Sequence, residues 1–379
     1  MAKLGEVCTI VSGSTPKTSV TSYWDGNIKW ITPAELNEDT FYIMDSVRHI
    51  TEEGKEKTGL SYLPTGTVIL SSRAPIGKTA IAGCKMCCNQ GFKNLICSDA
   101  IYNEYLYFFL KSKTDYLNSL GRGATFKEIS KSIVENIEIP LPEVNQQKEI
   151  AEKFKKLEQL ISLRKQQLAK LDELVKARFA NTFENDANFH TDYMENLSEF
   201  VTVGIANSAT HAYAEHGVVM LRNQNIKENH LDDTELVYIE PKFADKYKSK
   251  KLEANDILVT RTGYPGIACV VPQKYAGSQT FTTLIIRLKK GTNASSCYIC
   301  HYINSSHGKK YVSGTKVGVA QQNFGAKVLA KMPVIVPPIE LQNQFATFVA
   351  RIDQQKQTVQ QSLEKLELMK KALMQEYFG

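Results

Sequence analysis

The chain has little of what several special classes of protein require. Among its 379 residues no apolar run approaches the roughly 20 residues that span a bilayer, so we expect no membrane segment. Residues 1–6 contain no apolar signal-peptide core, and we therefore expect a cytoplasmic protein whose cysteines are free thiols. The 46 basic and 40 acidic residues leave a net charge of +6, which permits nucleic acid binding without requiring it.

Motifs for catalysis and cofactor binding are also missing. We find no Asn/Asp-Pro-Pro-Tyr/Phe motif, no glycine-rich turn for a methyl donor and no acidic cluster with a lysine typical of a nuclease. Residues 76–79 resemble the end of a phosphate-binding loop, but Ser72 stands where its first glycine is needed. Residues 297–301 have the spelling of a haem attachment motif, which we interpret as part of a buried helix. The cysteines of residues 84–88 have no second pair nearby, so we predict no zinc site.

What the chain does contain is an internal repeat. At an offset of 195 residues, segment 168–183 matches 363–378, Pro142 matches Pro337 and Gln147 matches Gln342. At offsets of 189 and 190 residues, segment 66–70 matches 255–259, Gly77 matches Gly266, and 30–32 matches 220–222. Several matches in the same order with nearly constant spacing indicate a chain built of two similar halves.

Each half begins with a segment of mixed secondary structure. β-Branched runs bounded by Gly, Pro and Asn predict strands at 68–71, 79–82, 257–260 and 268–271. After the strands we predict one helix in each half, at 102–116 and at 296–311.

Each half ends with a stretch that lacks both glycine and proline. Apolar residues recur there at alternating steps of four and three, which indicates a coiled-coil seam. In the first stretch the seam contains Ile150, Phe154, Leu157, Ile161, Leu168, Leu171 and Val175, with a break at Arg164. In the second it contains Phe345, Val349, Ile352, Val359, Leu363, Leu366 and Leu373, with breaks at Lys356 and Lys370. Prolines just before each stretch predict where the helices begin.

These patterns predict an α+β fold with four segments. Two tandem mixed α/β domains, at 1–142 and 184–336, are each followed by a long helix, at 143–183 and 337–379. We expect the two helices to pack as an antiparallel coiled coil related by a pseudo-twofold axis.

The ordered motifs resemble those of the specificity subunits of type I restriction–modification systems of bacteria and archaea. The resemblance rests on Leu-Gly-Glu-Val with residues 12–16, on the strand-turn element 66–77, and on the approach 139–147 into a long helix. It implies two target recognition domains, each reading one half of a split double-stranded DNA sequence, with the helices as a spacer that acts as a ruler.

The resemblance also implies partners that carry the chemistry. Two methyltransferase subunits would dock on the helices and methylate adenine, and restriction subunits would join through the complex. S-adenosylmethionine, Mg²⁺ and ATP are expected on those partner subunits only, so this chain would be non-catalytic and need no cofactor.

Candidate DNA contacts follow from residue chemistry within the matched segments. Arg, Asn and Gln read base edges, whereas Lys, Ser and Thr contact phosphates. The candidates of the first half are Trp30, Thr32, Arg73, Lys78 and Lys127. Those of the second half are Arg222, Asn223, Gln224, Asn225, Arg261, Tyr264, Lys316, Gln321 and Gln322.

Two alternatives of other classes remain open at this stage. The chain could itself be a DNA methyltransferase or nuclease, which binding of a methyl donor by the chain alone would reveal. It could also be a structural coiled-coil scaffold, which a footprint of two protected tracts separated by a fixed gap would exclude.

Overall fold

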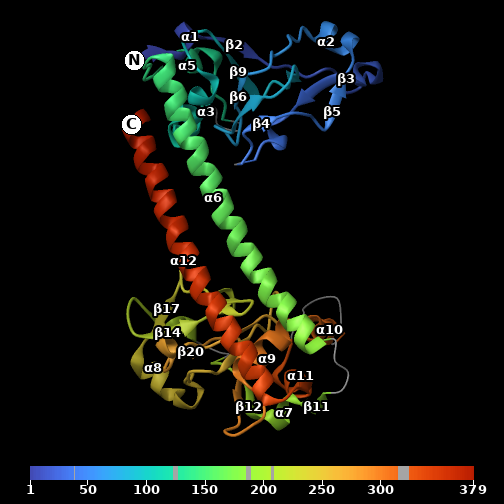
Figure 1. Ribbon diagram of the computed structural model, residues 1–379, viewed down its shortest axis with the longest axis vertical. Helices are drawn as coiled ribbons and strands as arrows, with labels where there is room; N and C mark the ends of the chain where they lie inside the picture. The colour runs from blue at the N-terminus through green and yellow to red at the C-terminus, as the bar shows by residue number, and fades with distance from the viewer. Residues whose placement is uncertain (38, 123–126, 185–188, 206–208, 315–323) are drawn as a thin grey trace. The chain divides into compact units, whose positions relative to one another are not determined.

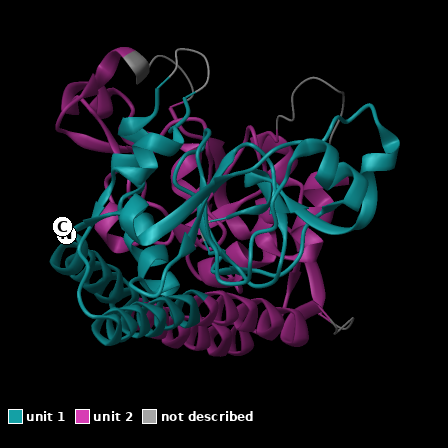
Figure 2. Cartoon of the chain, turned by 90° about the horizontal axis from the view of Figure 1, so that it is seen from above, with its two compact units in different colours: residues 1–165, 360–379 teal, residues 166–359 magenta. Residues whose placement is uncertain are grey.

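The computed structural model describes residues 1–37, 39–122, 127–184, 189–205, 209–314 and 324–379. The chain forms two compact units, unit 1 with residues 1–165 and 360–379 and unit 2 with residues 166–359 (Figure 2). Both divisions fall inside the long helices α6 (Val144–Phe179) and α12 (Ile339–Phe378). Each unit therefore contains one mixed α/β part and a portion of both helices, which confirms the predicted fold class at this level.

Unit 1 is built on a five-stranded and a three-stranded sheet. The first has the order β2 (Cys8–Ser12), β9 (Phe92–Cys97), β6 (Val68–Ser71), β7 (Thr79–Ala82) and β4 (Tyr42–Ile43). The second has the order β5 (Arg48–Ile50), β3 (Trp24–Ile31) and β8 (Cys87–Cys88), and β1 (Ala2–Lys3) pairs with β10 (Glu138–Ile139). The helices are α1 (Leu4–Val7), α2 (Glu52–Thr58), α3 (Asn103–Ser112), α4 (Thr114–Leu120) and α5 (Lys131–Glu135).

Unit 2 is built on two four-stranded sheets. One has the order β12 (Ser198–Val203), β21 (Leu284–Leu288), β18 (Ile257–Val259) and β19 (Ala268–Val270). The other has the order β13 (Tyr213–Ala214), β17 (Val237–Ile239), β14 (Val218–Leu221) and β20 (Gln279–Thr280). Two further pairs join β11 (His190–Tyr193) to β22 (Pro333–Val336) and β15 (Ile226–Lys227) to β16 (His230–Leu231). The helices are α7 (Met194–Leu197), α8 (Pro241–Lys246), α9 (Ser296–Asn304), α10 (Ser306–Gly314) and α11 (Ala326–Ala330).

The two units share a topology, as the sequence repeat predicts. The antiparallel series β2-β9-β6-β7 of unit 1 has the same connections as β12-β21-β18-β19 of unit 2. The parallel pair β3–β8 likewise corresponds to β14–β20. The four strands predicted from β-branched runs are β6, β7, β18 and β19, so these predictions are confirmed.

The shorter helices predicted at 102–116 and 296–311 are each divided in two, which corrects the sequence interpretation. In unit 2, Ser305 has an extended backbone (φ −75°, ψ 178°) between α9 and α10. Gly308 then lets α10 approach α9 closely, because a Cβ atom there would lie 2.1 Å from the carbonyl oxygen of Ile303. In unit 1, Lys113 separates α3 from α4 with a different backbone conformation (φ −101°, ψ 14°).

The long helices pack antiparallel inside unit 1. Glu158 of α6 accepts from Lys370 of α12 at 2.7 Å, and Lys165 lies 3.6 Å from Glu367, so rising numbers on α6 meet falling numbers on α12 (Figure 1). The end of α12 enters the core, where Phe378 stacks on Phe154 with ring centroids 5.6 Å apart.

The same arrangement is present inside unit 2. Phe183, directly after α6, packs against Phe345 near the start of α12, with ring centroids 5.5 Å apart. Further along, Lys356 of α12 lies 2.6 Å from Asp172 of α6. Lys356 and Lys370, the predicted breaks in the apolar seam, are thus partly buried and form ion pairs with the neighbouring helix. None of the described helices is both long and apolar enough to cross a membrane.

A buried glutamine fixes the start of each long helix. Gln147 and Gln342 are both 0% exposed. The Nε2 of Gln147 donates to the carbonyls of Pro142 (2.8 Å) and Ala100 (3.0 Å), while its Oε1 accepts from the N–H of Tyr102. Gln342 makes the corresponding three bonds in unit 2, with Pro337, Asn293 and Ser295. The repeat of this glutamine therefore has a structural cause.

Candidate nucleic-acid interface

In unit 2 the segment 222–225 forms a single tight turn. The backbone N–H of Arg222 donates to Asn225 Oδ1 at 2.9 Å, and the N–H of Asn225 donates back to the Arg222 carbonyl at 2.9 Å. The Nδ2 of Asn225 donates to the carbonyls of Asp232 and Glu235, and the residue is only 2% exposed. Asn225 therefore holds the turn from inside, while Gln224 before it is exposed and Arg222 and Asn223 are half-buried.

The remaining side chains of this turn are partly occupied. Arg222 Nη2 donates to the Glu235 carbonyl at 2.9 Å, and Gln224 Nε2 reaches the Glu235 carboxylate at 3.2 Å. Asn223 Nδ2 donates to Thr262 Oγ1 at 2.8 Å. Within the described part of the chain, Arg222 Nε and Asn223 Oδ1 are buried without a hydrogen-bond partner.

The bond from Asn223 connects the turn to a second element, the loop 260–267. Thr260 Oγ1 donates to the Tyr264 carbonyl at 2.6 Å and accepts from the N–H of Ile267 at 2.9 Å, which ties both sides of the loop together. Gly266 has φ +90°, a conformation that glycine adopts readily. At the tip, Tyr264 is 83% exposed. The loop is therefore anchored at its base while it exposes an aromatic side chain.

Unit 1 contains the same two elements with different side chains. Thr32 donates from both its N–H (2.7 Å) and its hydroxyl (3.1 Å) to Glu35 Oε1, which closes the turn 32–35. In the loop 71–78, Ser71 Oγ donates to the Pro75 carbonyl at 2.7 Å and accepts from the N–H of Lys78 at 2.8 Å. The loop also contacts the turn, because Lys78 Nζ donates to the carbonyls of Leu36 and Pro33.

A charged cluster lies beside the unit 1 loop. Glu128 accepts from Arg73 Nε at 2.9 Å and from Lys93 Nζ at 3.1 Å. Burial opposes ionisation of Glu128, but the bonds from Lys93 and Arg73 outweigh it and lower the pKa of this carboxyl. Arg73 and the neighbouring Lys127 are exposed, so two cations stand at the surface next to the loop.

Two predicted contact residues lie inside the fold instead. Trp30 is 3% exposed in β3, and its indole N–H donates to the Ser14 carbonyl at 3.0 Å. Asn225 is buried in the turn, as described above. Both side chains already have hydrogen-bond partners within the protein, and neither presents an edge to a base.

The other predicted residues fall into three groups. Arg222, Asn223, Gln224, Arg261 and Tyr264 come together in the turn and loop of unit 2. Thr32, Arg73, Lys78 and Lys127 belong to the turn, the loop and the adjoining segment of unit 1. Lys316, Gln321 and Gln322 lie outside the described residues.

Sequence reasoning missed the acidic residues that organise these surfaces. Glu235 accepts from Gln224 through its carboxylate and from Arg222 through its backbone carbonyl, and Glu128 accepts from Arg73, which lies 55 residues before it. Glu35 had a readable signal, since Thr-x-x-Glu is a capping-box pattern.

The discounted cysteine and histidine motif lies in the core, as expected. Tyr298, Cys300 and His301 of α9 are buried, and His301 contacts Phe345 with ring centroids 5.0 Å apart. Among the described residues no group of three or more His, Cys, Asp or Glu side chains could hold a metal ion.

Comparison with known proteins shows relatives of one kind. The chain is 39% identical over 184 residues to the MjaIX specificity subunit of a type I restriction enzyme from Methanocaldococcus jannaschii. This match covers 48% of the chain and 43% of the relative, so the chain spans less than half of that subunit's length.

Two solved structures share the fold over the whole chain. One is the S subunit of a type I restriction–modification system from M. genitalium, with 13% identity, a TM-score of 0.59 and 95% of that chain covered. The other comes from work on complex assembly and conformational transition of the type I system, with 15% identity, a TM-score of 0.65 and 96% covered. The family model described as the type I restriction modification DNA specificity domain matches residues 1–173 and again residues 192–368. The chain therefore belongs to the family of type I restriction modification DNA specificity domains.

Proposed function

We propose that this chain is the DNA-reading subunit of a type I restriction–modification complex and that each unit recognises one half of a split target. The observation that carries the proposal is the pairing of a tight turn with an anchored loop in both units. The pairing is the same, but the side chains differ. The turn of unit 2 begins with Arg222, Asn223 and Gln224, and the turn of unit 1 begins with Thr32, Pro33 and Ala34. Equal frames with different side chains suit two half-sites of different sequence.

The proposed DNA contacts are the exposed side chains of these elements. Gln224 and Asn223 carry amide groups of the kind that reads base edges, and Gln224 is the more exposed of the two. Tyr264 would lie against the sugar–phosphate backbone or a base. Arg73 and Lys127 would contact phosphates in the other half. The contacts of Arg261, Lys316, Gln321 and Gln322 also remain part of this proposal.

The segments have separate roles in this proposal. Residues 1–142 and 184–336 are the target recognition domains, and residues 143–183 and 337–379 form the spacer. Two methyltransferase subunits dock on the spacer and restriction subunits join the complex, in the cytoplasm. The chain itself is non-catalytic, and S-adenosylmethionine, Mg²⁺ and ATP bind to the partner subunits.

Methylome sequencing tests this function in the host. Strains with and without the gene are compared, with the partner genes left intact. We expect one bipartite motif, two short tracts separated by a fixed gap, to carry methylated adenines only when the gene is present. Identical methylated motifs in both strains would overturn the proposal.

A further inference from the structure

A short hairpin in unit 2 continues directly from the turn 222–225. Its strands β15 and β16 pair antiparallel, and Glu228 and Asn229 form the tip. The hairpin closes back on the turn, because the N–H of Asp232 donates to the Asn225 carbonyl at 2.8 Å. A displacement of the tip would therefore be transmitted to the turn.

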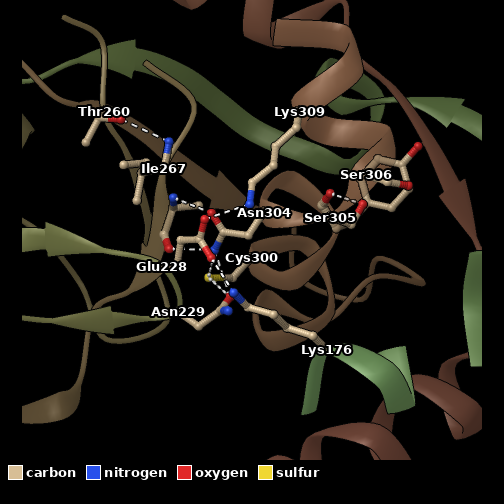
Figure 3. A network of polar contacts seen from close by, with 12 residues as sticks. Lys176, Glu228, Asn229, Thr260, Ile267, Cys300, Asn304, Ser305, Ser306 and Lys309 are labelled. Atoms are coloured by element: carbon tan, nitrogen blue, oxygen red, sulfur yellow. Dashed lines mark hydrogen bonds and ion pairs between the residues drawn. The ribbon is translucent and has the colours of Figure 1, made fainter. Parts of the chain in front are cut away.

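Asn304, the last residue of α9, joins this tip to strand β19. Its side chain is largely buried, and Nδ2 donates to Asn229 Oδ1 at 2.7 Å and to the Ala268 carbonyl at 2.9 Å (Figure 3). Its Oδ1 accepts from the N–H of Ala268 at 2.9 Å. Asn229 has φ +65°, a conformation that Asn tolerates better than most residues. The N–H of Asn229 also donates to the Ala268 carbonyl at 2.9 Å, so the Asn304 amide and this backbone bond together hold the tip against the first residue of β19.

The same contact reaches the loop 260–267. Ala268 follows Ile267, whose N–H donates to Thr260 Oγ1, and Thr262 within the loop accepts from Asn223. The turn, the hairpin and the loop therefore form a closed ring of contacts. The Asn223–Thr262 bond joins the turn to the loop, and Asn304 joins the hairpin to the residue that follows the loop.

A charged cluster holds the tip from two helices. The carboxylate of Glu228 accepts from Lys309 of α10 at 2.6 Å and from Lys176 of α6 at 3.1 Å (Figure 3). Burial opposes ionisation of Glu228, but the two lysines outweigh it and lower the pKa of this carboxyl. Because all three side chains are partly exposed, the pairs add little to stability and restrain the tip only modestly.

Unit 1 makes an analogous connection with other residues. Glu104 of α3 is 4% exposed, and its Oε1 accepts from the Tyr42 hydroxyl at 2.6 Å and from Lys155 of α6 at 3.1 Å. Tyr42 lies in β4, which follows the turn 32–35. In both units a lysine of α6 is thus connected to the segment after the turn. Lys155 bonds to Glu104, which also binds Tyr42, and Lys176 bonds to Glu228 of the hairpin itself.

We propose that Asn304 and the cluster Lys176–Glu228–Lys309 are positioning residues that set the turn and loop of unit 2 against its DNA half-site. Part of the sequence specificity of unit 2 would then depend on residues that do not touch DNA, one of them in the spacer helix α6. This inference rests on the proposed function, because it presupposes that unit 2 reads a half-site.

Two matched substitutions on opposite sides of one hydrogen bond test it. Asn304→Asp removes the donor, so that a carboxylate faces Asn229 Oδ1 and the Ala268 carbonyl. Asn229→Asp makes the same chemical change but keeps the acceptor of that bond. The full chain, assembled with its methyltransferase subunits, is titrated with cognate duplexes and with duplexes altered at one base of either half-site.

We expect Asn304→Asp to reduce discrimination at the half-site of unit 2 by about 10-fold, the scale of one well-made base contact. The Asn304→Asp complex should keep its discrimination at the other half-site within about twofold of the unsubstituted chain. The Asn229→Asp complex should stay within about twofold at both half-sites. An Asn304→Asp complex that loses affinity equally for every duplex would overturn the inference, because that result indicates a merely structural role.

A second pair of variants keeps the test decisive if Asn304→Asp does not fold. Lys176→Met removes the charge from the helix side of the cluster, while Lys176→Arg retains it. We expect Lys176→Met to lower discrimination at the same half-site about threefold. Lys176→Arg should discriminate as well as the unsubstituted chain. Equal discrimination in both variants would contradict the role of α6. If the unsubstituted complex discriminates at neither half-site, the proposed function itself fails.

Discussion

At the scale of single residues, the protein already occupies most polar groups near the two turns. Asn225 donates inward to two carbonyls, and Lys78 Nζ is bonded to the turn beside it. Exposed groups that remain for a ligand include the side chains of Gln224 and Tyr264. The internal bonds fix the backbone, so the exposed side chains are offered from a rigid frame, as precise recognition requires.

The buried glutamines allow a prediction about stability. Gln342→Leu would leave the Pro337 and Asn293 carbonyls and the Ser295 N–H without their partner, and each orphaned group costs about 1–3 kcal/mol. We expect the free energy of unfolding of unit 2 to fall by about 3–5 kcal/mol, and Gln147→Leu to act likewise on unit 1. Hydrogen exchange with mass spectrometry measures this in each unit. The exposed Gln146→Leu is the control, and equal protection in all three variants would contradict the prediction.

His301 gives unit 2 a dependence on pH. Burial, together with the charge of Lys356, lowers the pKa of His301 from 6.5 to about 4. The unfolded chain therefore binds a proton that the folded chain rejects, and the stability is complete above pH 6.5 and lost as the pH falls toward 4. Between pH 7 and pH 5 we expect a loss of about 2 kcal/mol from this group.

His301→Phe isolates that effect in denaturant unfolding. The variant should lose about 2 kcal/mol less stability than the natural chain over the same pH interval, whatever its stability at pH 7. Parallel pH profiles for the two proteins would show that His301 is not responsible.

At the scale of elements, each unit combines a turn and a loop that the strands hold in place. The loops 71–78 and 260–267 connect β6 to β7 and β18 to β19, so both project from buried strands. Glycines with positive φ, Gly77 and Gly266, close both loops. The loop bases are thus repeated, whereas the residues at the tips differ.

Two glycines of the unit 2 loop offer a matched comparison. Gly263 and Gly266 both have positive φ, but a Cβ atom on Gly266 would lie 2.7 Å from Val312, while on Gly263 it would meet nothing within 4 Å. Gly263→Ala should cost about 1 kcal/mol of stability from backbone strain alone. Gly266→Ala should cost about 2–3 kcal/mol and weaken DNA binding through displacement of the loop. Thermal unfolding measures the stability of the two variants, and a DNA titration measures their affinity for DNA. Equal losses in Gly263→Ala and Gly266→Ala would contradict the role of the contact with Val312.

The sequence predicted elements better than side-chain placement. Strands β6, β7, β18 and β19 and the starts of α6 and α12 follow from local signals, namely β-branched runs and prolines, and these were confirmed. The divisions α3/α4 and α9/α10 were missed, because they depend on how the second helix packs. Trp30 and Asn225 were assigned to the surface because their chemistry suits DNA. Both are buried in the fold, where Trp30 donates to Ser14 and Asn225 to Asp232 and Glu235.

At the scale of the whole molecule, we propose that the spacer formed by α6 and α12 measures a distance between two half-sites. Inside each unit the helices pack antiparallel, with apolar seams and ion pairs such as Glu158–Lys370 and Lys356–Asp172. A stiff pair of helices would fix the gap in the recognised sequence.

An insertion tests this ruler. Four residues added within α6 lengthen a helix by about 6 Å, which corresponds to about two base pairs. We expect the gap of the methylated motif to grow by about two base pairs, with both half-sites kept, provided the seam accommodates the stutter. Methylome sequencing reads the gap directly. An unchanged gap in an active variant would contradict the ruler.

The central claim is that each unit reads its own half of one split target, and an exchange of recognition domains tests it most directly. Residues 184–336 are replaced by the corresponding segment of a relative from the same family, and the host methylome is sequenced. The account predicts that one half of the bipartite motif changes while the other half and the gap remain. A motif in which both halves change, or neither, would contradict it.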